Sequence, residues 1–122
     1  MRGSSRGGTG PRAELSSTGL SLRAPIAVPV EIRAPARRVL RLAWNVGEDG
    51  IRLAGNAAFE PGRPVDVRFG LPDGEAFELR AEIAGGEADG DTPADELLFV
   101  DPPSEARIAL RRYVHERLGL PA

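Results

Sequence analysis

One short stretch of the chain has residue types and spacing that could do chemistry. Asn45-Val-Gly-Glu-Asp-Gly50 leads directly into the alternating residues Ile51, Arg52 and Leu53. Asparagine tolerates cap-like or left-handed backbone geometry and glycine permits positive φ, so the stretch is typical of a tight turn at the start of a strand. It is either a turn alone or what remains of a ligand-binding turn, and the rest of the sequence bears on the choice.

Residues that could catalyse a reaction or hold a metal ion are scarce. The absence of cysteine excludes thiol catalysis and zinc ribbons, and the single histidine, His115, cannot build a multi-histidine site. We expect His115 to be a solvated helix residue, because no serine or aspartate is fixed near it in the sequence. The acidic residues at 87–96 miss the spacing of a calcium-binding EF-hand loop and indicate a flexible, solvated hairpin. We therefore predict no enzyme activity, no metal site and no cofactor.

Charge and hydropathy exclude further classes of protein. The formal net charge of −2 argues against a nucleic-acid partner and against anionic lipid. No apolar run approaches the roughly 20 residues that span a bilayer, and the N-terminus lacks the apolar segment of a secretory signal, so we expect a soluble, cytoplasmic protein without membrane insertion. With 122 residues, 41% of them hydrophobic but only 5% aromatic, the chain can form one domain with an aliphatic core.

The pattern of apolar residues predicts strands followed by one helix. Alternation with a period of two predicts strands at 28–32, 38–44, 50–54, 65–71 and 77–83, and a short apolar run predicts one at 96–100. Apolar residues at three- and four-residue spacing predict a helix at 104–118, capped by Ser104 and ended by Gly119.

These elements describe a mainly β fold, a six-stranded antiparallel β-barrel with a C-terminal α-helix at residues 21–122. Residues 1–20 form a Gly/Ser/Arg-rich segment that we expect to be a flexible tail. Within the second predicted strand, Leu40, Leu42 and Trp44 share one face, and we expect Trp44 to pack in the core.

The order of these elements resembles that of the PilZ domain, over about residues 22–118. The counterparts of the family's strands, turn and helix are the segments "VPVEI", Asn45-x-Gly47-x-x-Gly50, "EPGRPVDVRFGLPDGEAFELRAEI", "LLFV" and "RIALRRYVHERL". The resemblance implies a small signalling or adaptor domain whose ligand is cyclic di-GMP.

The residues that the resemblance assigns to the ligand are incomplete here. Family members carry Arg-x-x-x-Arg before the first strand and Asp/Asn-x-Ser-x-x-Gly at the turn; the planar guanidinium forks of the arginines meet phosphates and guanine edges. In this chain Arg23 matches the first arginine but Ala27 replaces the second, and Gly47 stands where the family has serine, whereas Asn45 and Gly50 match. The motif keeps the residues that form the turn but lacks the serine hydroxyl that would contact the ligand, which predicts weak or lost nucleotide binding.

Three alternatives remain open from the sequence. "RAPAR" at 33–37, with the adjacent Arg38, fits the arginine motif in letters and could form a displaced clamp for cyclic di-GMP, although a hairpin turn with solvated arginines is the plainer interpretation. "ELSSTGLSL" at 14–22 imitates the second motif, which we interpret as coincidence or a vestige. The domain could also have lost the nucleotide altogether and bind only a protein partner.

Overall fold

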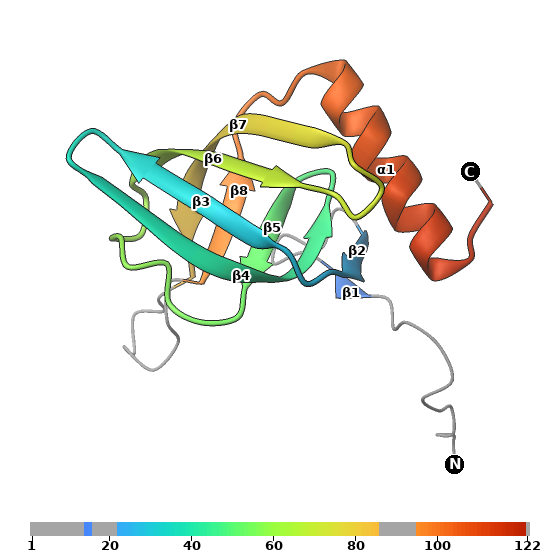
Figure 1. Cartoon of the computed structure of the whole chain (residues 1–122), viewed down its shortest axis with the longest axis horizontal. Helices are drawn as coiled ribbons and strands as arrows, with labels where there is room; N and C mark the ends of the chain where they lie inside the picture. The colour runs from blue at the N-terminus through green and yellow to red at the C-terminus, as the bar shows by residue number, and fades with distance from the viewer. Residues whose placement is uncertain (1–13, 16–21, 86–94, 122) are drawn as a thin grey trace, which may run out of the picture.

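The structure, a computed structural model, describes residues 14–15, 22–85 and 95–121, and about half of these residues lie in strands (Figure 1). The strands are β1 (Glu14–Leu15), β2 (Leu22–Pro25), β3 (Pro29–Ala34), β4 (Arg37–Gly47), β5 (Gly50–Leu53), β6 (Pro64–Gly70), β7 (Ala76–Ala84) and β8 (Glu96–Phe99). One helix, α1 (Ser104–Leu118), follows them.

The strands close into a barrel because β5 pairs with β8 on one side and with β4, the second strand of the β3–β4 hairpin, on the other. The order of neighbours is β4-β3-β6-β7-β8-β5, and β5 also pairs with β4, so six strands form a complete antiparallel ring. The remaining two strands extend the sheet beside β4, since β2 pairs with the end of β4 and β1 pairs with β2. A closed ring leaves its six strands no free edges except where a strand extends beyond its neighbour.

Alternate residues of each long strand fill the barrel. On β6, Val65, Val67 and Phe69 are buried and the residues between them are exposed, and β7 shows the same alternation. The core is mainly aliphatic, as the composition predicts, with Phe69 between the rings of Phe77 and Phe99 at centroid distances of 5.3 and 6.1 Å.

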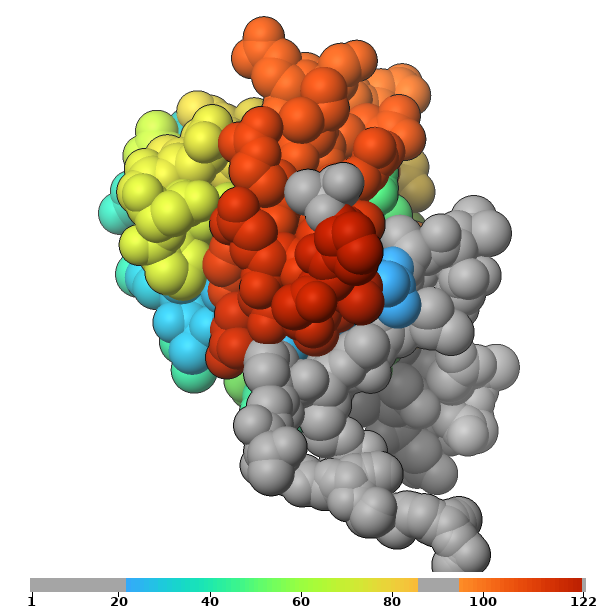
Figure 2. Space-filling view, turned by 90° about the vertical axis from the view of Figure 1, so that its right-hand side faces the viewer, coloured from blue at the N-terminus to red at the C-terminus, as the bar shows by residue number. Residues whose placement is uncertain are grey.

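Helix α1 packs against the barrel beside β2 (Figure 2). Its residues Ala106, Ala109 and Leu110 join the core. The Tyr113 hydroxyl donates a hydrogen bond to the carbonyl of Pro25 at 3.3 Å, which ties the helix to the end of β2. The helix ends at Gly119, as expected, where a left-handed φ of 73° lets the next amide bond back to the His115 carbonyl. The expected cap is wrong: Pro103 occupies the N-cap position, and Ser104 is the first helical residue.

The fold prediction is confirmed, with one correction to the core and two short strands missed, β1 and β2. Leu40, Leu42 and Trp44 face outward, and Trp44 is 58% exposed rather than buried, because the core-facing residues of β4 are Ala43 and Val46. Strand β4 carries apolar residues on both faces, so alternation alone could not orient it. A register shift between Ala43 and Asn45 then places Val46, not Asn45, on the core face.

The N-terminal segment was only partly accounted for from the sequence. Strand β2 was not predicted, because its four residues, Leu-Arg-Ala-Pro, show no clear alternation. Glu14–Leu15 pair with Arg23 and Leu22 of β2, which places two residues of the expected tail in a short ladder. The rest of residues 1–20 lies outside the described residues, and their flexibility stays a prediction.

Truncation of Leu110 tests the packing of the helix. Leu110 is fully buried, so Leu110→Ala should lower the free energy of unfolding by about 2–5 kcal/mol, because it leaves a cavity between α1 and the sheet. Ile108, on the same helix, is 51% exposed, and Ile108→Ala should change it by no more than about 0.5 kcal/mol. Urea unfolding measures both, and equal losses would show that α1 is not docked as described.

Candidate functional site

The side chain of Arg23 lies across two glycines on the surface of the sheet that faces away from the core. Val46, Ile51 and Leu97 point into the core, so their neighbours Gly47, Gly50 and Glu96 lie on the opposite face. A Cβ atom on Gly47 would lie 2.9 Å from Arg23 Cδ, and a Cβ atom on Gly50 would lie 2.9 Å from Arg23 Nη2. The two glycines therefore leave room for the arginine to lie flat on the sheet.

This close approach, and not positive φ, explains why the turn contains glycine. Neither Gly47 nor Gly50 has a positive φ, which corrects the expectation from the sequence. Besides the arginine, a Cβ atom at Gly47 would meet the backbone carbonyl of Leu22 at 2.5 Å, and one at Gly50 would meet that of Leu97. Both glycines are therefore required by contacts with neighbouring strands as well as with Arg23.

Three side chains of the same chain surround the guanidinium of Arg23. Its Nη1 donates to Asn45 Oδ1 at 3.0 Å, and its Nε donates to Asp49 Oδ1 at 3.1 Å. Its Nη2 lies 2.9 Å from Glu96 Oε2 and forms an ion pair with it. Arg23 and Glu96 are each 1% exposed, so this contact is removed from water.

The charge of Arg23 is compensated by the two carboxylates. Glu96 also lies near a second cation, with its Oε1 3.6 Å from Arg52 Nη2. The formal charges of Arg23, Arg52, Asp49 and Glu96 sum to zero. A buried arginine needs such partners, because an uncompensated charge in a poorly solvated place costs several kcal/mol. We call these four residues with Asn45 the Arg23 cluster.

The turn that carries Asp49 is also held from the helix. Glu48, its neighbour in the two-residue turn between β4 and β5, accepts from Arg111 Nε at 3.1 Å and from Arg111 Nη2 at 3.2 Å. Arg107 Nη2 lies 3.7 Å from the same carboxylate. The hydrogen bond and charge of Glu48 raise the pKa of Arg111, which stays cationic. Adjacent acidic residues thus join the turn to β2 on one side and to α1 on the other.

The structure brings Arg23, Asn45, Gly47 and Gly50 together, as their assignment to one site predicts, but it gives Arg23 an internal role. Ala27 follows β2, is exposed and offers no donor. Sequence reasoning gave Asp49 no role and placed Glu96 in a flexible, solvated hairpin, which is wrong for Glu96, because it belongs to β8 and is 1% exposed. Asp49 lies inside the turn motif at a position without an assigned role, and Glu96 reaches Arg23 only through pairing between β5 and β8.

The arginines considered as a displaced clamp lie at the other end of β4. Arg38 lies seven positions before Asn45, about 23 Å away along an extended strand. Arg33 pairs with Glu78 at 3.4 Å, and Arg38 pairs with Glu31 at 3.3 Å. Arg37 donates to the Ala58 carbonyl at 2.9 Å and lies over the ring of Phe59. The three guanidinium groups have different partners, although Arg33 and Arg38 are cross-strand neighbours.

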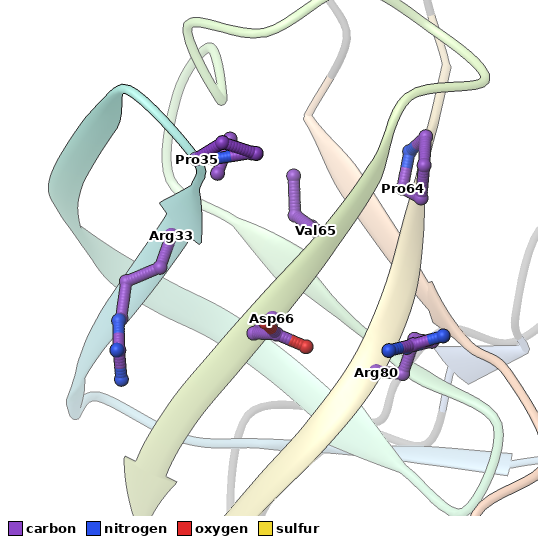
Figure 3. Close-up of a pocket in the computed structure, with 7 residues that line it drawn as sticks. Arg33, Pro35, Pro64, Val65, Asp66 and Arg80 are labelled. Atoms are coloured by element: carbon purple, nitrogen blue, oxygen red, sulfur yellow. The ribbon is translucent and has the colours of Figure 1, made fainter.

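A shallow pocket of about 460 Å³ lies near this end of the barrel (Figure 3). Arg33, Asp66 and Arg80 are consecutive cross-strand neighbours on β3, β6 and β7, and the two arginines lie on either side of the aspartate. None of the residues of the Arg23 cluster lines this pocket.

Within residues 14–15, 22–85 and 95–121, no group of three His, Cys, Asp or Glu side chains is placed to hold a metal ion. The helix in the described part of the chain is not long and apolar enough to cross a membrane.

The barrel, its C-terminal helix and the turn motif beside β2 define a PilZ domain. The sequence profile of the PilZ domain matches residues 20–116, and the chain belongs to this family. No curated protein matches the sequence.

Two solved structures are similar in fold. The Bacillus subtilis inhibitor of motility MotI/DgrA superposes with a TM-score of 0.65 at 19% identity over 80% of this chain, which spans only 50% of that protein's chain. The PilZ domain of CeSA from a cellulose-synthesizing bacterium gives a TM-score of 0.52 at 17% identity, over 77% of this chain and 95% of that one. At these identities the likeness concerns the fold alone.

A double-mutant cycle tests the ion pair at the centre of the cluster. Arg23→Met should lower the free energy of unfolding by about 3–5 kcal/mol, because it removes a cation from the buried carboxylate of Glu96. Combining it with Glu96→Gln should cost at least about 1 kcal/mol less than the sum of the single changes. Arg33→Met, which breaks an exposed pair, is the control and should cost no more than about 1 kcal/mol. Urea unfolding that finds Arg23→Met as mild as the control would contradict the cluster.

Restoring the family's serine should fail at Gly47. Gly47→Ser should lower the free energy of unfolding by about 1–3 kcal/mol, because its Cβ atom cannot fit beside the Leu22 carbonyl without moving β2. Gly70→Ser is the matched control, since a Cβ atom there would lie 3.6 Å from its nearest neighbour. Thermal unfolding compares the two variants, and a Gly47→Ser protein as stable as the control would refute the close approach.

Proposed function

We propose that this protein is a PilZ adaptor domain that has little or no affinity for cyclic di-GMP and acts by contacting a protein partner. One observation carries the proposal: the arginine that matches the family's nucleotide clamp, Arg23, is bound by Asp49 and Glu96 of its own chain. These two carboxylates occupy the guanidinium edges that the phosphates or guanine bases of a ligand would need.

The cost of freeing Arg23 sets the expected loss of affinity. A nucleotide that took the guanidinium would have to separate it from a carboxylate that is only 1% exposed. Breaking a buried pair costs about 3–5 kcal/mol. At 1.4 kcal/mol per decade, this cost alone weakens binding by about two to four decades. The two carboxylates would also repel the phosphates of the ligand.

The second half of the family's clamp does not offset this cost. Ala27 has no donor, so one guanidinium fork is missing from the outset. The arginines at 33, 37 and 38 are no substitute, because they lie at the far end of β4 and hold separate partners. We therefore favour lost binding over a displaced clamp.

A role through protein contact follows from the family and from what remains on the domain. PilZ domains in general are binding and adaptor modules, and MotI/DgrA is described as an inhibitor of motility. By analogy of fold, we infer that this chain acts without catalysis and in the cytoplasm, by occupying a partner rather than by sensing the nucleotide.

Calorimetric titration with cyclic di-GMP tests the proposal on three forms of the protein. The unmodified chain should give no saturable heat at low-micromolar nucleotide. Ala27→Arg alone should add little, because Arg23 stays bound to its own carboxylates. Ala27→Arg combined with Asp49→Asn and Glu96→Gln should bind measurably, since the amides keep the shape of the cluster while releasing the charge. Low-micromolar binding by the unmodified chain would overturn the proposal.

A further inference from the structure

Strand β4 carries an apolar stripe on the outside of the barrel. Leu40, Leu42 and Trp44 are 64%, 52% and 58% exposed, and they account for three of the five exposed large hydrophobic residues in the described part of the chain. They alternate along one strand face, about 13 Å from end to end. Exposed Pro29, the cross-strand partner of Leu42, widens the stripe. A contiguous apolar patch of this kind on a soluble domain marks an interaction surface.

Both ends of the apolar stripe present cations to solvent. At one end Arg38 is 73% exposed, while Glu31, its partner, is 16% exposed. At the other end Arg52 is 39% exposed above Glu96, which is 1% exposed. In each pair the carboxylate lies beneath and the guanidinium lies outermost, so the local surface is positive although the chain as a whole has a net charge of −2.

Segments of this chain outside the described residues have the wrong composition to cover the stripe. Residues 1–13 contain Met1 as their only large apolar residue and carry three arginines, which match the charge of the stripe's ends instead of opposing it. Residues 16–21 contribute one leucine, and residues 86–94 contain no apolar residue larger than proline.

We propose that the apolar stripe binds an acidic amphipathic helix of a partner protein, an inference that rests on the adaptor role proposed above and names its partner class and surface. Alternate residues of a strand are about 6.6 Å apart, and helix residues four apart are about 6 Å apart, so three successive apolar side chains of a helix meet Leu40, Leu42 and Trp44 in register. Carboxylates flanking that helix face pair with Arg38 and Arg52.

Charge disfavours two other possible occupants of the stripe, a second copy of this chain and a lipid bilayer. A second copy laid antiparallel on the stripe brings Arg38 of one copy toward Arg52 of the other, and a parallel copy brings the two Arg38 side chains together. A bilayer would have to take up the ionic groups of Glu31, Arg38 and Arg68, which lie on the same face as the stripe.

Trp44 is the only tryptophan of the chain, so its fluorescence reports directly on the stripe. Three tryptophan-free synthetic peptides serve as probes: an acidic amphipathic helix with leucine at every fourth position, the same helix with lysine in place of glutamate, and a scrambled acidic peptide. The acidic helix should shift Trp44 emission to the blue and protect it from acrylamide, with an affinity at least tenfold above that of the other two.

Substitutions place the binding on the stripe. Leu42→Asp should weaken binding of the acidic helix at least tenfold and Arg38→Glu severalfold. Ile108→Asp is the matched control, since Ile108 on α1 is 51% exposed against 52% for Leu42, and it should leave binding unchanged. Circular dichroism verifies that each variant is folded.

Four results would overturn the inference. The first two are the absence of a saturable emission shift at millimolar acidic helix, and equal binding of the acidic and basic helices. The third is a blue shift that increases with protein concentration, together with a dimer in sedimentation. The fourth is a blue shift when vesicles of anionic phospholipid replace the peptide. The last two would assign the stripe to a second copy or to a membrane. Cyclic di-GMP calorimetry on the unmodified chain tests the proposed function separately from peptide binding, because the stripe does not include Arg23 or its carboxylates.

Discussion

The positive charge of Arg23 on the outer face of the sheet is the constraint on which the site depends. An arginine that is 1% exposed must find acceptors within the protein, and here they come from three separate strands or turns. Asn45 contributes from β4, Asp49 from the following turn and Glu96 from β8. Gly47 and Gly50 have no side chains because the arginine lies over them. The two glycines of the turn motif therefore provide the space in which the Arg23 side chain lies.

The chemistry that suits a guanidinium to a nucleotide also suits it to a pair of carboxylates. Each offers oxygen acceptors to a planar fork of donors, so replacing one by the other needs no change of fold. Such a buried cluster adds little to stability compared with apolar packing, yet breaking it is costly. An arginine held in this way is a structural residue, even though its position in the sequence matches a ligand-binding one.

The elements of the fold were predictable because apolar and polar residues alternate in β3, β6 and β7, and because apolar residues recur at helical spacing in α1. The orientation of β4 was not, since it has apolar residues on both faces and its register shifts near Trp44. The grouping of Arg23 with Asn45 and the two glycines could be predicted from the family resemblance. Its carboxylate partners could not, because Asp49 and Glu96 lie 26 and 73 positions away in the chain and meet Arg23 only through the pairing of β4, β5 and β8.

The central claim, that Arg23 is held by its own chain and is not available to a nucleotide, can be tested directly by NMR of the arginine Nε–Hε groups. In a protein labelled with nitrogen-15, the Arg23 signal should exchange with solvent much more slowly than those of exposed arginines such as Arg33, and it should not move when cyclic di-GMP is added. An Arg23 signal that exchanges as fast as that of Arg33 and shifts in proportion to added nucleotide would contradict the account.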